Sequence, residues 1–164
     1  CHLNRDELYP RIDEVIADAQ KAGVKKFLVV GYDKKTSLLA VKIAKKYDFC
    51  YAAIGFHPTE IFDLSEKDYN SVMELAKTEK KVVAIGEIGL DYHWIKDPIQ
   101  REIQKEYFIR QIEFANYVGL PICVHNRDAV SECLDILKEY TPKYTFILTF
   151  CEQFCATDKK CSMI

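Results

Sequence analysis

Acidic and imidazole side chains follow short apolar runs of this sequence, and their types suit a metal-dependent reaction. Glu87, His57 and His125 each stand at the end of such a run. An ionised glutamate at the end of a buried strand is costly unless a cation, a metal ion or hydrogen-bond donors compensate it. Two imidazoles and a carboxylate are also the ligand set of a divalent ion that keeps positions open for water and substrate. These residue types predict a catalytic metal site if the fold brings them together.

Each of these residues also has a structural interpretation. Glu87 is consistent with an exposed strand end, and the flanking Gly86 and Gly89 either let a ligand approach the backbone or mark a bulge. A lone His125 is typical of a hydrogen-bonded core histidine, and His57 before proline is typical of a turn. The metal interpretation is favoured because the three residues recur at successive strand ends.

The elements that would position these residues alternate along the chain. Apolar runs predict strands, and apolar residues at helical spacing predict helices. The expected strands are 26–31, 51–56, 82–87, 121–125 and 144–150, and the expected helices are 6–22, 40–47, 65–76, 97–118 and 129–140. Such alternation specifies parallel βαβ units, hence a doubly wound sheet or a (β/α)8 barrel. Both folds gather catalytic groups at the carboxyl ends of their strands.

Strand alternation adds a finer expectation about side-chain direction. Residues two apart in a strand point to the same face. The sequence therefore predicts that Val83 and Ile85 share a face with Glu87, and that Cys123 shares a face with His125.

Length and composition indicate an ordered globular protein. The chain has 164 residues, is 49% hydrophobic and 29% charged, and carries a net charge of −2. This charge excludes a strongly basic nucleic-acid wrapper but allows a local phosphate pocket, since a metal ion can supply the positive charge.

With no apolar run near the roughly 18 residues of a membrane span and no secretory signal, we expect an intracellular protein, cytoplasmic or nuclear, without a membrane partner. Seven cysteines lack zinc-ribbon spacing, which predicts mostly reduced thiols.

Several stretches form a recognisable combination. Cys1-His2-Leu3 looks like the tail of a Thr-His-x-His-Leu opening, and residues 55–58 form a Gly-x-His-Pro element. AIGEIGLDYHW (84–94) is followed by Gln-Arg-Glu (100–102) and by LPICVHNRDA (120–129). From Cys1 to about Tyr144 the chain resembles the TatD family of metal-dependent deoxyribonucleases.

The resemblance implies a fold, a cofactor and a substrate. The fold would be an α/β, amidohydrolase-like (β/α)8 TIM-type barrel that holds one or two divalent ions (Mg, Mn or Zn) and hydrolyses DNA phosphodiesters. His2, Glu87 and His125 match the family's metal ligands, and Glu87 is the residue that can bridge two ions and that we assign as catalytic.

Further residues match positions around such a site. His57 and Arg127 are candidate contacts for the substrate phosphate, and Asp91 and Tyr92 are candidate supports behind the metal ligands. Arg127 before Asp128 is equally consistent with a structural ion pair, Asp91 with a turn cap and Tyr92 with a packed core residue.

The chain departs from the family pattern at both ends. The first histidine of the opening pair would precede Cys1, where we expect a further segment. After Tyr144 the family's His-Cys-Phe-Ser-Gly-like and Asp-Ser-Pro motifs give way to TFILTFCEQFCATDKKCSMI. We therefore expect an incomplete barrel domain in residues 1–143 and a divergent strand and tail in 144–164.

These departures leave the function open in two ways. An unclosed barrel has open sheet edges that favour self-association. The chain is then either an impaired nuclease or a non-catalytic, truncated form of one. A related metal-dependent hydrolase acting on another ester or amide is a further alternative.

Overall fold

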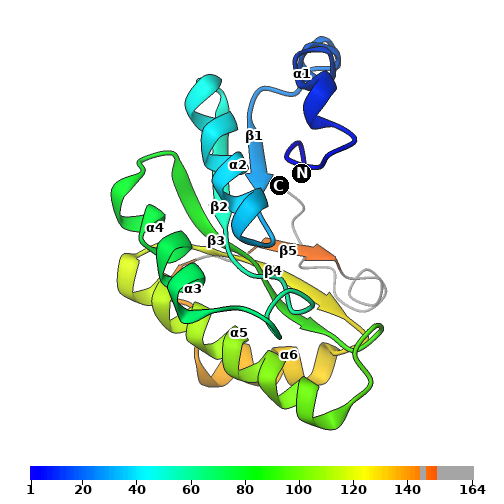
Figure 1. Ribbon diagram of the computed structural model, residues 1–164, viewed down its shortest axis with the longest axis vertical. Helices are drawn as coiled ribbons and strands as arrows, with labels where there is room; N and C mark the ends of the chain where they lie inside the picture. The colour runs from blue at the N-terminus through cyan, green and yellow to red at the C-terminus, as the bar shows by residue number, and fades with distance from the viewer. Residues whose placement is uncertain (145–146, 151–164) are drawn as a thin grey trace.

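A computed structural model describes residues 1–144 and 147–150, which form one parallel sheet with its helices on one face (Figure 1). All neighbouring strands pair in parallel. The strands are β1 (Phe27–Val30), β2 (Cys50–Ile54), β3 (Val82–Asp91), β4 (Ile122–Arg127) and β5 (Ile147–Phe150). The helices are η1 (Tyr9–Arg11), α1 (Ile12–Lys21), α2 (Lys34–Lys46), α3 (Glu66–Met73), α4 (Leu75–Thr78), α5 (Pro98–Val118) and α6 (Val130–Glu139).

The strand order separates the two folds that the sequence leaves open. The sheet runs β1-β2-β3-β4-β5, so every strand lies beside its successor. A doubly wound sheet reverses its order at a switch point, whereas a (β/α)8 barrel adds each strand on the same side. The described strands therefore form part of a (β/α)8 barrel, as predicted.

The two faces of the sheet are packed very differently. The helix-covered face holds the main core, where aliphatic and aromatic residues of helices and strands such as Ile43, Ile85 and Phe108 are buried together. The opposite face carries a small cluster formed by Val30, Ala53, Ala84 and Cys123, one residue from each of four strands. In a barrel this second face is the interior, so the site residues at its rim lie above small side chains.

Helix boundaries follow the capping residues. Asp97 accepts a hydrogen bond from the amide of Gln100, and α5 ends at Gly119 with φ 76°, which confirms the predicted helix. Ser65 caps α3 in the same way, through the amide of Asp68.

The first helix is shorter than predicted. The chain before Tyr9 forms turns, in which the amides of Leu8 and Tyr9 both donate to the carbonyl of Arg5. A 3-10 turn containing Pro10 follows, and the α-helix starts only at Ile12. Proline has no amide to donate and fixes its own φ, so it suits a first turn better than a helix interior.

Strand β3 differs from the prediction in length and in side-chain direction. Glu87 does not end the strand, which continues to Asp91. Ile85 pairs with Ile122 and Ile88 with Val124, so three steps along β3 match two along β4. This extra residue is a β-bulge, and a bulge reverses the alternation of faces. Ile85 consequently packs in the helix-covered core while Glu87 lines a cavity, and the predicted shared face is wrong.

The glycines beside Glu87 allow the close approach of strand β4. A Cβ on Gly86 would lie 2.4 Å from the Cβ of Cys123, and one on Gly89 would lie 2.0 Å from the carbonyl oxygen of His125. Gly89 also has φ 142°, which residues with a side chain rarely adopt. The bulge interpretation of these glycines is therefore confirmed, and the atoms that approach them belong to β4.

Three further expectations concern membrane-spanning helices, the state of the cysteines and the domain boundary. Among the described residues no helix has both the length and the apolar character needed to cross a membrane. The cysteines described, Cys1, Cys50, Cys123 and Cys133, are all free thiols, as predicted. Residues 145–146 and 151–164 lie outside the described residues, so the division into 1–143 and a divergent 144–164 stays a prediction.

Candidate metal centre

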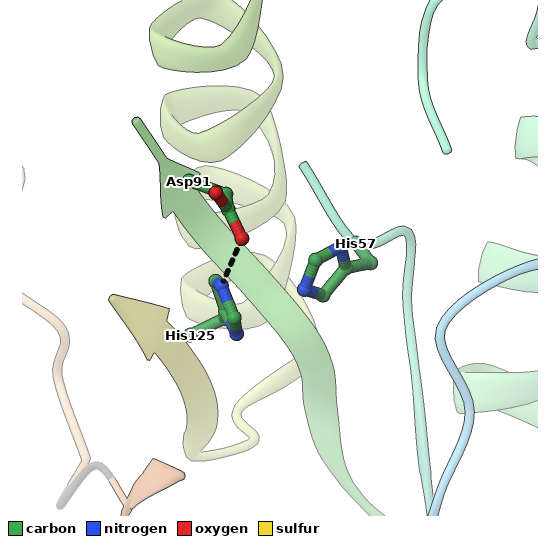
Figure 2. A group of neighbouring side chains, drawn as sticks. All are labelled: His57, Asp91 and His125. Carbon is green, nitrogen blue, oxygen red and sulfur yellow. Dashed lines mark hydrogen bonds and ion pairs between the residues drawn. The ribbon is translucent and has the colours of Figure 1, made fainter. Parts of the chain in front are cut away.

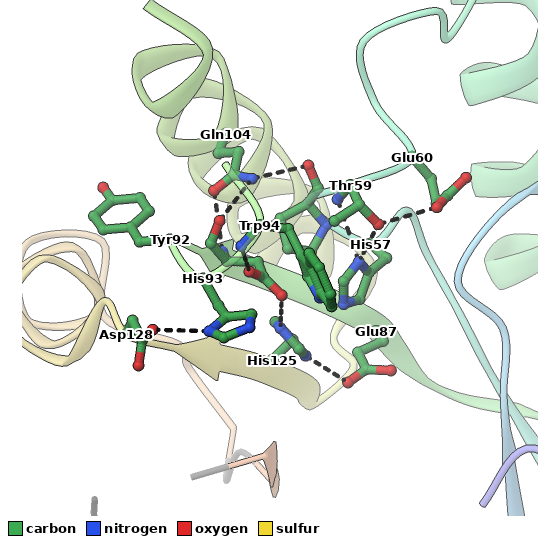
Figure 3. A network of polar contacts seen from close by, with 12 residues as sticks. His57, Thr59, Glu60, Glu87, Tyr92, His93, Trp94, Gln104, His125 and Asp128 are labelled. Carbon is green, nitrogen blue, oxygen red and sulfur yellow. Dashed lines mark hydrogen bonds and ion pairs between the residues drawn. The ribbon is translucent and has the colours of Figure 1, made fainter. Parts of the chain in front are cut away.

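The imidazole of His125 lies between two buried carboxylates of β3, that of Asp91 (Figure 2) and that of Glu87 (Figure 3). Its Nδ1 is 3.2 Å from Oε1 of Glu87, and its Nε2 is 3.0 Å from Oδ2 of Asp91. Glu87 is 5% exposed and Asp91 only 1%. A neutral imidazole carries one ring proton and donates to only one carboxylate, so its other nitrogen has a lone pair available for a cation. The convergence of Glu87 and His125 is the geometry that the sequence predicts.

His2 approaches the same glutamate from the start of the chain. Its Nε2 is 3.4 Å from Oε2 of Glu87, and its Nδ1 is 3.0 Å from the carbonyl oxygen of Val30. A carbonyl only accepts, so Nδ1 carries a proton, and the neutral ring presents the lone pair of Nε2 to the carboxylate. Metal-binding histidines commonly donate their second nitrogen to a carbonyl in this way. The Nε2 lone pair and the carboxylate oxygen are both acceptors and repel each other. A cation between them, either a metal ion or a proton, removes this repulsion, so the two residues fit a cation.

His57 has the opposite orientation of its ring nitrogens. Its Nδ1 lies 2.8 Å from the hydroxyl of Thr59 and accepts from the amide of Thr59 at 3.2 Å. Because the amide only donates, Nδ1 presents its lone pair there and the neutral ring carries its proton on Nε2. Desolvation, followed by the nearby His125, lowers the pKa of His57 to about 4, which keeps the ring neutral at physiological pH. The rings of His57 and His125 are 4.1 Å apart, centroid to centroid, at 66°. His57 is thus arranged as a hydrogen-bond donor beside the carboxylates.

Two overlapping groups of candidate metal ligands share His125. One consists of His2, Glu87 and His125. The other consists of His57, Asp91 and His125, whose ligand atoms all lie within 4.8 Å of one another (Figure 2). The proton on Nε2 of His57 favours the first group as the metal ligands, because a protonated ring nitrogen has no lone pair to give.

Asp91 is fixed by hydrogen bonds on both of its carboxylate oxygens. Oδ1 accepts from the amide of Trp94 at 2.9 Å, while Oδ2 contacts His125. Its backbone amide donates to the side chain of Gln104 at 3.0 Å. A carboxylate held in this way is suited to orienting an imidazole, which agrees with its predicted supporting position and also with the turn-cap alternative.

Two buried glutamines of α5 hold the chain on either side of His57. Gln104 donates to the carbonyl of Pro58 at 3.1 Å as well as accepting from Asp91. Gln111 accepts from the amide of Phe56 at 2.9 Å and donates to its carbonyl at 3.1 Å. The sequence interpretation missed both, although two glutamines a helical heptad apart on an apolar helix face are a detectable signal.

Tyr92 lies away from the cavity. Its ring is 4% exposed, packs in the core and is covered by the guanidinium of Arg101 at 4.2 Å from the ring centroid. Its amide donates to the carbonyl of Arg127 at 2.9 Å. Tyr92 therefore joins the ends of β3 and β4 through its backbone, and its side chain matches the packed-core alternative.

An open cavity of about 540 Å³ lies over these residues. Its lining includes four predicted residues with imidazole or guanidinium groups, His2, His57, His125 and Arg127, together with Glu87. The lining also includes Arg5, Tyr32, Thr59 and Glu60, which the sequence interpretation missed. Two arginines and a cation site in one cavity suit an anionic substrate. Nearness in sequence to His2 and His57 was the only signal for Arg5 and Thr59.

Burial also limits the chemistry of Cys123, below the site. Desolvation, with a smaller contribution from the charge of Glu87, raises the pKa of this thiol to about 12. Cys123 is consequently a neutral thiol in this setting, which leaves the imidazole and carboxylate groups as the candidate ligands.

Comparison with known proteins gives one consistent result. The family model described as TatD related DNase matches residues 1–157. The chain is 48% identical over 139 residues to an uncharacterized metal-dependent hydrolase, YabD, of Bacillus subtilis, covering 85% of this chain and 53% of that protein. It is 31% identical over 139 residues to the 3'-5' ssDNA/RNA exonuclease TatD of Escherichia coli, covering 85% of this chain and 52% of that protein.

Solved structures agree with the sequence relatives. The crystal structure of YJJV, a TatD homolog from Escherichia coli, superposes with a TM-score of 0.79 at 28% identity and covers 85% of this chain and 54% of that chain. A TatD family hydrolase from Entamoeba histolytica superposes with a TM-score of 0.74 at 25% sequence identity. The match covers 85% of this chain and 52% of that chain. The chain thus spans about half the length of the relatives it matches.

Proposed function

The chain belongs to the TatD related DNase family, and from that premise we propose that it hydrolyses phosphodiester bonds of DNA with a divalent metal ion. Relatives are named as metal-dependent hydrolases and as a nuclease of single-stranded DNA and RNA. The observation that supports the proposal best is the carboxylate of Glu87, which lies between the imidazoles of His2 and His125 in a cavity that two arginines also line.

His2, Glu87 and His125 would hold the ion. One or two divalent ions at this position would polarise a phosphoryl oxygen and lower the pKa of bound water. Two imidazoles with one carboxylate suit Mn²⁺ or Zn²⁺ at least as well as Mg²⁺, because nitrogen ligands favour the transition metals.

The surrounding residues would bind and orient the substrate. The Nε2–H of His57 faces the ligand group and is a donor for a phosphate oxygen, and the guanidinium fork of Arg127 offers a second, charged contact. Asp91 keeps the imidazole of His125 in one orientation. Tyr92 holds the ends of the two strands that carry Asp91 and Arg127 together.

The first test measures cleavage of an end-labelled single-stranded DNA by the full chain with Mg²⁺, Mn²⁺ or Zn²⁺. We expect metal-dependent product that falls at least about 100-fold in Glu87→Ala and in Glu87→Gln, because either change removes a charged ligand. Glu106→Gln, on the exposed face of α5, is the matched control and should cleave as the unchanged chain does.

Equal product from the unchanged chain and both Glu87 variants would contradict the proposal and favour the non-catalytic form. Parallel assays with RNA, a carboxylic ester and an amide separate the nuclease from a hydrolase with another substrate. Size measurement of the same sample tests self-association through the edge strands β1 and β5.

A further inference from the structure

Trp94 is a large aromatic side chain exposed at the candidate site. It is the only tryptophan of the chain, and 66% of its surface is accessible. Exposed apolar residues are common on protein surfaces, so exposure alone has no functional meaning. Ile99 and Tyr117, for example, are exposed by 74% and 77%. The position of Trp94 relative to the cavity is what distinguishes it.

Trp94 is attached directly to the residues of the site (Figure 3). Its amide donates to Oδ1 of Asp91, whose other oxygen contacts His125. The guanidinium carbon of Arg127, which lines the cavity, lies 5.6 Å from the centroid of the indole ring. Arg127 therefore connects the aromatic surface with the place where a phosphate would bind.

A second contact fixes the orientation of the indole. The ring of His93 meets it edge-on, with centroids 4.8 Å apart and an angle of 90°. His93 is held in turn by Asp128, whose Oδ2 is 3.3 Å from its Nδ1. Asp128 has φ 55°, so its backbone is in the left-handed region where asparagine and aspartate are tolerated. Contacts from the loops after β3 and β4 thus hold an aromatic plane at the edge of the cavity.

An aromatic plane beside a phosphate site matches the way proteins bind single-stranded nucleic acids. Bases stack on aromatic side chains while basic groups follow the backbone, and arginine adds a cation–π contribution. A base within a duplex is already stacked on its neighbours, so only an unpaired base presents both faces.

We propose that Trp94 stacks on an unpaired base of a single-stranded nucleic acid whose neighbouring phosphate contacts Arg127. This inference rests on the proposed function and adds a base-binding residue to it: Trp94 holds an unpaired base beside the scissile phosphate. The bonding is non-covalent, and sequence preference follows stacking strength.

The single tryptophan provides a direct measurement in the full chain. With EDTA present to prevent cleavage and at low salt, an oligothymidylate should quench the emission of Trp94, and an abasic oligomer of equal length should not. Labelled-oligomer anisotropy then gives the affinities of the variants. In Trp94→Ala the preference for oligothymidylate over the abasic oligomer should fall by about 5- to 150-fold, the range expected for one stacked base.

Two variants control for unspecific effects. Trp94→Phe keeps an aromatic ring and should restore most of the preference. Tyr117→Ala removes an exposed aromatic residue at the other end of α5, and should leave the preference unchanged.

Equal affinity of the unchanged chain for both oligomers, or an unchanged preference in Trp94→Ala, would overturn the inference. Failure to bind either oligomer would overturn it as well. The nuclease proposal is tested separately, by cleavage of the abasic oligomer in the presence of metal. This oligomer has no base to stack, so the dependence of its cleavage on Glu87 reports on the metal site alone. Quenching without cleavage would therefore reject the nuclease and keep the stacking site, and cleavage without quenching would do the reverse.

Discussion

Two carboxylates of β3 contact the same imidazole, but the regions around them are built differently. On one side Glu87 faces His2, a residue 33% exposed in its side chain, and opens onto the cavity. On the other side Asp91 is 1% exposed; its Oδ1 accepts a hydrogen bond from the amide of Trp94, and its Oδ2 contacts His125. These contacts hold the carboxylate of Asp91 in one position, from which it orients the imidazole of His125.

The difference indicates how one strand can supply two kinds of acid. Glu87 faces a ring nitrogen that carries a lone pair in the neutral histidine, which is an unfavourable contact until a cation enters. Asp91 faces a backbone amide and an imidazole, which are contacts an anion favours without any metal. The bulge at Gly86 brings Glu87 to the cavity side, so both acids reach the same imidazole.

The largest expected effect is on metal affinity. Glu87→Gln removes a charged ligand, and we expect a cost of about 3–5 kcal/mol, comparable with breaking a buried ion pair and equal to about 10²- to 10⁴-fold in Mn²⁺ affinity. Asp91→Asn removes an orienting partner, for which about 10- to 100-fold is typical. Calorimetric titration with Mn²⁺ measures both, with Glu106→Gln as the control. A larger loss of Mn²⁺ affinity in Asp91→Asn than in Glu87→Gln would indicate that His57, Asp91 and His125 are the metal ligands instead.

The next effect concerns pH and the Asp91 side of the site. The pKa of His57 is about 4 in the folded chain and about 6.5 when unfolded. As pH falls from 6.5 to 4, the unfolded chain takes up a proton that the folded chain does not. This proton uptake lowers the free energy of unfolding by roughly 3 kcal/mol across the window, with no contribution above pH 6.5.

Urea unfolding of the metal-free chain between pH 4 and 8 measures this loss. In His57→Gln this part of the pH dependence should disappear, whereas His93→Gln, at an exposed histidine, should keep it. Parallel curves for the unchanged chain and His57→Gln would show that His57 titrates as an ordinary surface histidine, and the donor position proposed for it would then be wrong.

Local signals in the sequence predicted much of the fold. The apolar runs, the caps Ser65 and Asp97 and the final Gly119 are properties of neighbouring residues, so the elements they define appear close to the expected places. The meeting of Glu87 with His125 was predictable for a similar reason, because parallel strands place their carboxyl ends together.

The remaining features depend on contacts between distant segments. The bulge in β3 arises where Gly86 and Gly89 pack against β4, and no pattern within β3 alone distinguishes it from regular alternation. The clamp formed by Gln104 depends on where α5 lies relative to Asp91 and Pro58. Sequence motifs thus identified the chemical groups, but not the bonds that hold them in position.

The smallest expected effect tests whether the Asp91 side is fixed by α5. Gln104→Leu leaves the amide of Asp91 and the carbonyl of Pro58 without their buried partner, and Gln111→Leu does the same to both backbone groups of Phe56. Each change should lower the free energy of unfolding by about 1–3 kcal/mol, the usual cost of an unsatisfied buried group. Urea unfolding at pH 7 measures this loss, and Gln100→Leu, at the exposed start of α5, serves as the control.

Metal affinity separates the two glutamines. Gln104 bonds the backbone of Asp91 itself, so Gln104→Leu should also weaken Mn²⁺ binding by a few-fold, less than the about 10-fold or more expected for Asp91→Asn. Gln111 holds only the strand before His57, so Gln111→Leu should change stability without changing Mn²⁺ affinity. Equal losses of metal affinity in both variants would mean that α5 acts on the site only through general stability, and that Asp91 is held by Trp94 and His125 alone.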